Sequence, residues 1–275
     1  MSKADLIFID MCKDILANGY SSKGQKVRPR WEDGTPAHTV KKFGVVNRYN
    51  LLEEFPIMTL KHTSLKKSVD ELFWIWQKKS SNINELGSKI WDAWADEDGS
   101  IGKAYGYQLG IKHKYKEGEF DQVDRVLFDL KNNPYSRRII TSLYNHHDLH
   151  EMNLYPCAYS MTFNVTGNKL NTILNQRSQD VLAANNWNVV QYSILTYLIA
   201  HVSGLKPGEF VHVIADAHIY DRHIPIIEEL ISRPIYDAPE FIMNKEKTDF
   251  YKFTSSDFKL KGYKKGPHVS FPVAV

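Results

Sequence analysis

The chain has 275 residues, of which 43% are hydrophobic and 24% charged, and its formal net charge is +3. This length suits one large domain or two small ones, and the composition is typical of a soluble globular protein. The small positive charge suits an anionic small molecule. It argues against a dedicated nucleic-acid partner, which needs a concentrated basic surface.

Only two cysteines occur, Cys12 and Cys157, so a disulfide framework is excluded, and no CxxC pair suggests zinc. Three aspartates interrupt the first sixteen residues, where a secretory signal needs a continuous apolar region. The longest apolar run, residues 189–202, is too short and too polar to span a bilayer. We therefore expect a cytoplasmic protein with no membrane partner.

The first predicted element is a helix, because Phe8, Cys12 and Ile15 recur at helical spacing and Asn18-Gly19 supplies a stop. This helix places Cys12 in the core, where cysteine commonly acts as a small hydrophobic residue. Residues 23–39 are rich in glycine, proline and charge, which predicts a long loop.

Two more amphipathic helices are predicted, one around residues 69–76 with Glu71 near its apolar face, and one around residues 123–130. Polar and apolar residues then alternate over 160–165, a turn follows, and a second extended run begins at Lys169. This pattern predicts a β-hairpin with one buried face.

A fourth helix is expected at residues 189–202 and a strand at residues 209–220. Strands and helices interleave without the regular alternation of a doubly wound fold, and there is no glycine-rich phosphate loop. The simplest interpretation is a single α+β domain covering residues 1–275.

Cys157 directly follows Pro156, which fixes the backbone at the start of the predicted hairpin. The cysteine is either a packed core residue or a nucleophile aimed into a cleft. Several arginines in the sequence favour the second role, because guanidinium groups bind phosphate and lower the pKa of a neighbouring thiol. The candidates are Arg28, Arg30, Arg137, Arg138 and Arg177.

Asn188 lies where a loop enters a helix, so it is either a helix N-cap or an amide that recognises a uracil-like ring. His218 and Tyr220 alternate along a strand and suit hydroxyl recognition or a core pair. Cys157, Asn188 and His218 also fit a cysteine hydrolase, but no local protease signature surrounds the sulfur. The histidine-containing segments match no metal motif, so we expect no metal.

Taken together, these segments resemble the successive motifs of the thymidylate synthase family. The matching segments, in chain order, are DGTPAHT, ELFWIWQ, IWDAWADEDGSIGKAYG, NNPYSRRII, YPCAYSMTFNV, QRSQDV, WNVVQYSILTYLIAHVSGLKPGEF, DAHIYDRH and FPVAV. The resemblance runs from about Arg28 to Val275. It implies an α+β fold with a large mixed β-sheet flanked by helices.

The resemblance also implies an activity and a set of partners. The expected enzyme is a methyltransferase that converts dUMP to dTMP, with methylenetetrahydrofolate as the one-carbon and hydride donor and dihydrofolate as the second product. It acts as a homodimer, because two arginines that match the family's pair enter the neighbouring subunit's site. These are Arg137 and Arg138.

The same resemblance assigns roles by position. The expected catalytic residues are Cys157 as nucleophile, Glu71 and Tyr105 for proton transfer, Arg177 and Asn188. The expected dUMP ligands are Arg28, Arg137, Arg138, Gln176, Arg177, Ser178, Asp180, Asn188, His218 and Tyr220. The expected folate contacts are Trp91, Trp94, Leu154, Asp180 and Ala274, with Val275 in the closing tail.

The chain departs from the family pattern at a few positions. Ala184 and Ala215 stand where glycine is usual, and Ser64 stands where many members have a histidine on the folate side. Two alternatives follow: a dUMP hydroxymethylase, in which water captures the intermediate, and a non-catalytic nucleotide- or RNA-binding relative. Trp91 and the intact PVAV tail favour the dry, reductive outcome.

Overall fold

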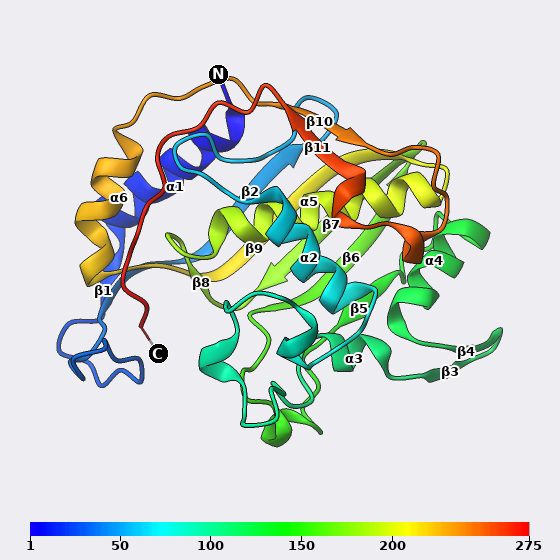
Figure 1. Ribbon diagram of the computed structural model, residues 1–275, viewed down its shortest axis with the longest axis horizontal. Coiled ribbons are helices and arrows are strands. Elements are labelled where there is room, and N and C mark those ends of the chain that lie inside the picture. The colour runs from blue at the N-terminus through cyan, green and yellow to red at the C-terminus, as the bar shows by residue number, and fades with distance from the viewer. Residues whose placement is uncertain (275) are drawn as a thin grey trace.

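The fold is built on one mixed β-sheet, and the computed structural model describes residues 1–274 (Figure 1). The strand order is β1-β2-β9-β7-β6-β5, with β8 beside β9. Strand β9 pairs in parallel with β7 and β8, and the other pairs of this sheet are antiparallel. The strands are β1 (Tyr20–Ser21), β2 (Thr39–Asn50), β5 (Ile140–Ser142), β6 (Ala158–Thr166), β7 (Lys169–Gln176), β8 (Gln179–Asp180) and β9 (Lys206–Tyr220).

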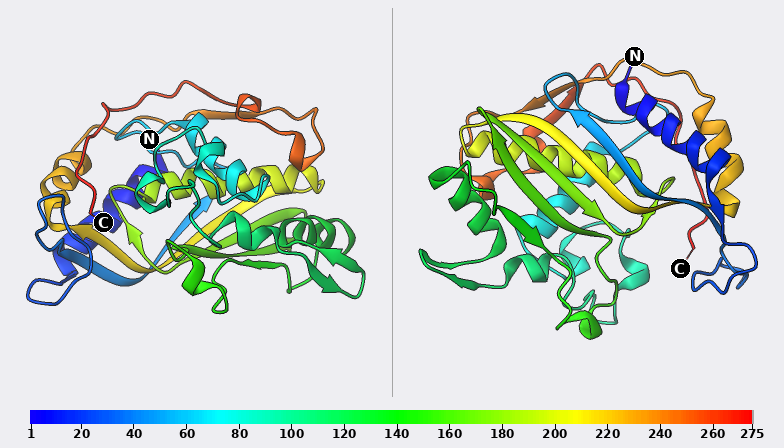
Figure 2. Two further views of the ribbon diagram at one scale, coloured as in Figure 1. Left: turned by 60° about the horizontal axis from the view of Figure 1, so that its bottom comes forward. Right: turned by 180° about the vertical axis from the view of Figure 1, so that it is seen from behind.

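Helices α2 and α5 cover one face of this sheet, and the view from behind shows the strands in front of α5 (Figure 2). The helices are α1 (Lys3–Asn18), α2 (Leu65–Trp76), α3 (Gly106–Gly110), α4 (Gln122–Asn132), α5 (Asn185–Val202) and α6 (Ile224–Ile231). Two small antiparallel pairs lie outside the sheet: β3 (His113–Tyr115) with β4 (Gly118–Phe120), and β10 (Glu240–Met243) with β11 (Phe258–Lys261). The expected α+β fold with a large mixed sheet is therefore confirmed.

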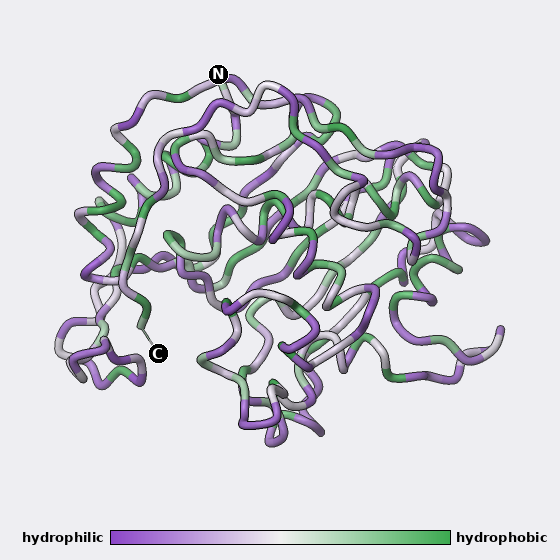
Figure 3. The backbone as a smooth tube through the Cα atoms, in the orientation of Figure 1, coloured by the Kyte–Doolittle hydropathy of each residue, from purple (hydrophilic) through white to green (hydrophobic). Residues whose placement is uncertain are grey.

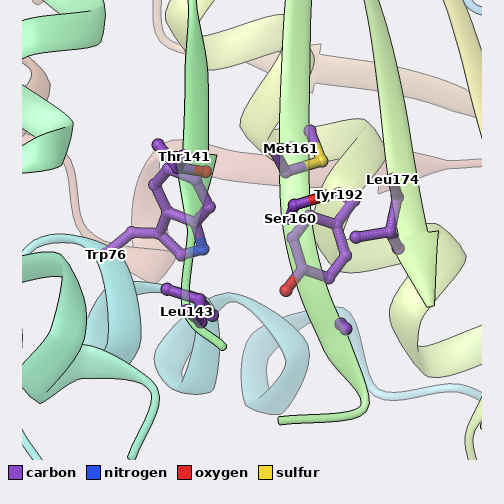
Figure 4. A pocket seen from close by; sticks show the side chains of 8 residues that line it. Trp76, Thr141, Leu143, Ser160, Met161, Leu174 and Tyr192 are labelled. Atoms are coloured by element: carbon purple, nitrogen blue, oxygen red, sulfur yellow. The ribbon is translucent and has the colours of Figure 1, made fainter. Parts of the chain in front are cut away.

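The core lies between the sheet and its covering helices. Trp76 of α2 and Tyr192 of α5 pack on Met161 and Leu174 of the sheet, leaving no space for a water molecule (Figure 4). Helix α5 is apolar around most of its circumference, as expected of a helix buried between other elements. The predicted core position of Cys12 is confirmed, because its side chain is fully buried.

The predicted helices and hairpin are present, but two details differ. Helix α5 begins at Asn185, with Ala184 as its N-cap, so Asn188 lies inside the first turn and is not the cap. Strand β2, which follows the predicted loop, was not expected. The loop itself is present and largely hydrophilic (Figure 3).

Candidate active site

A pocket of about 980 Å³ opens beside the carboxyl ends of β7 and β8. It gathers most of the residues that the sequence nominated, from widely separated segments. Those that line it are Arg28, Glu71, Trp91, Trp94, Tyr105, Leu154, Cys157, Gln176, Arg177, Ser178, Asp180, Asn188, His218, Tyr220 and Ala274. Val275 lies outside the described residues.

Cys157 is half-buried at the start of β6, and Arg177 follows the last residue of β7. Pairing of the two strands joins the residues, because the backbone N–H of Arg177 donates to the Cys157 carbonyl over 2.9 Å. The guanidinium group is fixed by hydrogen bonds to the carbonyls of Pro156 (3.0 Å) and Tyr155 (2.7 Å). Its Nη2 atom consequently lies 3.7 Å from the Cys157 sulfur.

The arginines lower the thiol pKa as expected, but burial has the larger and opposite effect. Burial raises the pKa of Cys157, and the charges of Arg177 and Arg28 oppose that rise without reversing it. The reason is that removal from water disfavours the thiolate more strongly than two guanidinium groups favour it. The backbone N–H of Cys157 also donates to the Tyr105 hydroxyl over 3.1 Å, which ties Tyr105 to the nucleophile's own backbone.

Glu71 is only 5% exposed and projects from α2 toward α5. Its carboxylate accepts from Gln191 Nε2 (3.1 Å) and Trp187 Nε1 (3.2 Å). Burial raises the pKa of Glu71 to about 7, although both donors favour the charged form. A carboxyl group with such a pKa exchanges a proton readily near neutral pH, as a general acid or base must.

On the opposite wall of the pocket, His218 and Tyr220 project from β9. Their rings make an edge contact with centroids 5.1 Å apart. His218 Nδ1 lies 2.9 Å from Oδ1 of Asp216. The other carboxylate oxygen of Asp216, Oδ2, accepts from Lys41 over 2.7 Å. This pair therefore presents the remaining ring nitrogen and a phenol oxygen for hydroxyl recognition.

The far part of the pocket is bordered by Asp180 and the C-terminal segment. His223 lies between them: its Nδ1 atom is 3.6 Å from the Asp180 carboxylate, and its Nε2 atom is 2.8 Å from the Pro272 carbonyl. Burial alone raises the pKa of Asp180, but His223 and neighbouring donors hold it below its usual value. The buried His223 ring thus lies between the Asp180 carboxylate and the Pro272 carbonyl of the C-terminal segment.

Lys61 is buried in this region and donates to the Leu182 carbonyl over 2.6 Å. Burial lowers its pKa to about 8, against the opposing effect of Asp180. Its ammonium group also lies 5.3 Å from the centre of the Phe271 ring, so it contacts the same C-terminal segment.

The arginines of the sequence prediction divide into two groups. Arg28 is exposed at the pocket rim, on a loop anchored by Trp31, whose Nε1 donates to Asp221 over 3.0 Å. Arg137 and Arg138 are exposed on the segment after α4. They are not among the described residues that line this chain's pocket.

Sequence reasoning missed several residues that line the pocket or contact the nominated ones, namely Gln191, Trp187, Lys61 and His223. A signal existed for Gln191, because positions three apart on a helix share a face, which places Gln191 beside Asn188.

Two general findings concern the described residues 1–274. No helix in this range combines the length and apolar character that crossing a membrane requires. No group of three or more histidine, cysteine, aspartate or glutamate side chains in this range is arranged to hold a metal ion.

Fold and pocket together define an α+β enzyme with a cysteine beside a fixed guanidinium group. The thymidylate synthase family model matches residues 6–275. Thymidylate synthases of Bacillus subtilis subsp. natto and Bacillus phage phi3T are both 45% identical over the full length of both chains. The solved structure of thermostable thymidylate synthase A from Bacillus subtilis superposes with a TM-score of 0.94 at 43% identity, covering 99% of each chain. The chain belongs to the thymidylate synthase family, and the predicted methyltransferase activity is confirmed.

Proposed function

We propose that the pocket binds dUMP beside Cys157 and methylenetetrahydrofolate beyond it, and that Cys157 is the nucleophile. The observation that carries this proposal is the thiol held 3.7 Å from a guanidinium group in a pocket that also contains a buried carboxyl group. A uracil ring is a poor nucleophile at position five until a thiolate adds at position six and converts it to an enolate.

In the proposed reaction, the Cys157 sulfur bonds to position six and the enolate carbon at position five attacks the methylene group of the folate. Loss of the proton at position five then allows the folate to leave, and hydride transfer from tetrahydrofolate completes the methyl group. The sulfur–carbon bond breaks as dTMP and dihydrofolate form. Tyr105 and Glu71 are the proposed proton carriers, since both line the pocket and Tyr105 contacts the Cys157 backbone.

The nucleotide ligands follow from the same arrangement. A phosphate group requires several donors, and the proposed ones are Arg28, Arg177 and Ser178, which all line the pocket. Asn188 would recognise the uracil edge, and His218 with Tyr220 the ribose hydroxyl. Gln176 and Asp180 complete this wall.

The folate is proposed to lie against the aromatic and apolar wall made by Trp91, Trp94 and Leu154, with Asp180 as its polar contact. Trp91 packs edge-on against Tyr105, with ring centroids 4.9 Å apart, so this wall adjoins the catalytic centre. Ala274 and the tail cover the opening and would exclude water from the intermediate.

A homodimer is the proposed assembly, and the sheet supports it. On the face away from α5, Ile140, Thr162, Ile173 and Val211 stand opposite one another on successive strands, and Ile140 is 56% exposed. A row that is apolar at three of its four positions suits an interface between two copies. Two free cysteines suit the reducing cytoplasm as the proposed compartment.

The test is an assay with dUMP and methylenetetrahydrofolate that follows dihydrofolate by absorbance and identifies the pyrimidine product. We expect dTMP and dihydrofolate in equal amounts. Hydroxymethyl-dUMP with tetrahydrofolate would contradict the proposal, and absence of turnover would favour a binding role.

The nucleophile has its own test. Cys157→Ser should abolish the covalent adduct with fluoro-dUMP, seen as a mass increase in denaturing mass spectrometry. Cys12→Ser is the matched control and should keep the adduct, because Cys12 is buried in the core. An adduct that survives in Cys157→Ser would show that another residue attacks.

A further inference from the structure

Side-chain amides form a continuous chain of hydrogen bonds from the sheet to Glu71. His212 Nε2 lies 2.8 Å from Gln176 Oε1, and Gln176 Nε2 lies 3.3 Å from Asn188 Oδ1. Asn188 Nδ2 then lies 3.4 Å from Gln191 Oε1, and Gln191 Nε2 lies 3.1 Å from Glu71. Four of these five residues are buried, and Asn188 borders the pocket.

Two backbone carbonyls fix the direction of this chain. The Ser178 carbonyl lies 3.0 Å from Gln176 Nε2, and the Ser68 carbonyl lies 3.4 Å from Gln191 Nε2. A carbonyl oxygen only accepts, so each glutamine must present its NH₂ group there and its oxygen on the other side. The orientation of each amide therefore follows from its partners, which is the sound basis for assigning it.

The first member of the chain agrees with this direction. Burial lowers the pKa of His212 to about 3, so the ring is neutral and has a single N–H group. Since Gln176 Oε1 can only accept, that N–H is on Nε2. The Nδ1 atom has no hydrogen-bond partner among the described residues and remains a bare acceptor.

Asn188 is consequently held with its oxygen toward Gln176 and its NH₂ group toward Gln191. A second donor, Gln179 Nε2, lies 3.4 Å from the same oxygen. Uracil offers an N–H donor beside a carbonyl oxygen, whereas cytosine offers a bare nitrogen beside an amino group. An asparagine fixed in one orientation matches uracil, and the same side chain turned by 180° matches cytosine.

We propose that Gln191 is a positioning residue that locks Asn188 in the uracil-recognising orientation with its oxygen and holds the Glu71 carboxylate with its NH₂ group. One side chain thereby couples recognition of the base to proton transfer. This inference rests on the proposed function and names the residue that sets its base specificity.

The groups that face Glu71 show that Gln191 has few substitutes. From α5, the donors are Gln191 and Trp187, and Tyr192 is a buried titratable neighbour. Trp91 faces it from the segment before residues 92–94 and also favours the charged form of Glu71, although its Nε1 atom has no hydrogen-bond partner among the described residues. Loss of the Gln191 donor would therefore raise the pKa of Glu71 further.

The test compares Gln191→Leu with two variants that each remove one half of the arrangement. Gln179→Leu removes a donor to Asn188 and leaves the donors to Glu71, whereas Trp187→Phe removes a donor to Glu71 and does not touch the amide chain. Two quantities are measured: the ratio of the dissociation constants of dCMP and dUMP by titration calorimetry, and the pH dependence of dUMP turnover.

We expect Gln191→Leu to reduce the dCMP/dUMP ratio about tenfold, the usual effect of one buried hydrogen bond, and to move the acidic limb of the turnover profile upward by about one pH unit. Gln179→Leu should change only the ratio of the dCMP and dUMP dissociation constants. Trp187→Phe should change only the acidic limb of the turnover profile. If Gln191→Leu does not fold, Gln191→Met, which keeps the chain length, takes its place with the same expectations.

The inference would be overturned if the Gln191 variant left either the ratio of the dCMP and dUMP dissociation constants or the acidic limb of the turnover profile unchanged. This failure is distinct from failure of the proposed function, because the calorimetry requires no turnover. The wild-type product assay tests that function separately.

Discussion

At the scale of single residues, Glu71 shows how a catalytic requirement opposes stability. The carboxyl group is almost fully buried, and its pKa rises from an ordinary value of 4.5 to about 7. A group whose folded-state pKa is raised binds its proton more tightly in the folded protein than in the unfolded chain. Its neutral form therefore stabilises the fold below pH 7, and this contribution is lost as pH rises from about 4.5 through 7.

Glu71→Gln removes this titration, so the stability of the variant relative to the wild type should increase with pH. Between pH 5 and pH 8 the difference in unfolding free energy should shift in favour of the variant by about 2–3 kcal/mol. Urea denaturation at both values measures it. Turnover of dUMP should fall at least a hundredfold, about the contribution of one proton-transfer group. A pH-independent difference would show that the carboxyl group is not neutral in the folded protein at pH 5.

At the scale of elements, the turn that carries Tyr105 is held by close backbone contact. Tyr105 has φ of 45° and ψ of −104°, and Lys79, on the neighbouring segment, has φ of 54°. Such conformations cost about 1–3 kcal/mol each in a non-glycine residue and persist only where the surroundings enforce them. Gly106 provides that enforcement, because a Cβ atom there would lie 2.3 Å from the Ser80 carbonyl oxygen.

Gly106→Ala should therefore separate the two segments and displace Tyr105. We expect turnover to fall at least tenfold, while binding of dUMP alone changes little, since Tyr105 is the proton carrier rather than a nucleotide ligand in the proposed mechanism. Gly106 does not have a positive φ, so Gly167→Ala, at a positive-φ glycine with no atom near the added carbon, is the control for backbone strain without a close contact. Equal effects of the two substitutions on turnover would argue that the contact at Ser80 is unimportant.

Elements with strong periodicity were predictable, and the others were not. Residues 69–76 and 160–165 show clear helical and alternating patterns, and both lie in the expected elements. The start of α5 was misplaced because asparagine is common both at caps and in loops, whereas here Asn185 and Asn186 are buried helix residues. Strand β2 was missed because many of its residues are polar or partly exposed, which weakens the alternation signal.

The candidate site was predictable by motif, but its electrostatics were not. The sequence nominated Cys157 and Glu71, and both line the pocket. The arginines lower the thiol pKa as expected, but the larger effect of burial could not be predicted, because burial depends on the packing of distant segments. The amide chain through Gln191 could not be predicted for the same reason, since its members come from α2, α5, β7 and β9.

At the scale of the whole molecule, apolar residues are exposed on one face of the sheet, and Arg137 and Arg138 are not among the described residues that line the pocket. Thr162 and Ile173 stand opposite each other on the face away from α5, and Ile173 is 38% exposed. Arg137 and Arg138 precede β5, the strand at the edge of the same sheet, and lie outside this chain's pocket. The proposed symmetric dimer through the open face would account for both features, if each subunit sends its two arginines to the other's phosphate site.

Mixing two inactive variants tests this arrangement. Cys157→Ser lacks the nucleophile, and Arg137→Ala/Arg138→Ala lacks the shared arginines, so each should be inactive or nearly so. In a mixed dimer with shared sites, one pocket combines an intact Cys157 with intact arginines from its partner, and the other pocket carries both defects. Random exchange makes about half of the dimers mixed, so about a quarter of all pockets become native and activity should return to about a quarter of the wild-type value.

The measurement is dUMP turnover after the variants are unfolded and refolded together, with each variant refolded alone as the control. If the arginines serve their own subunit, no mixed pocket is complete and the activity stays at the average of the two parents.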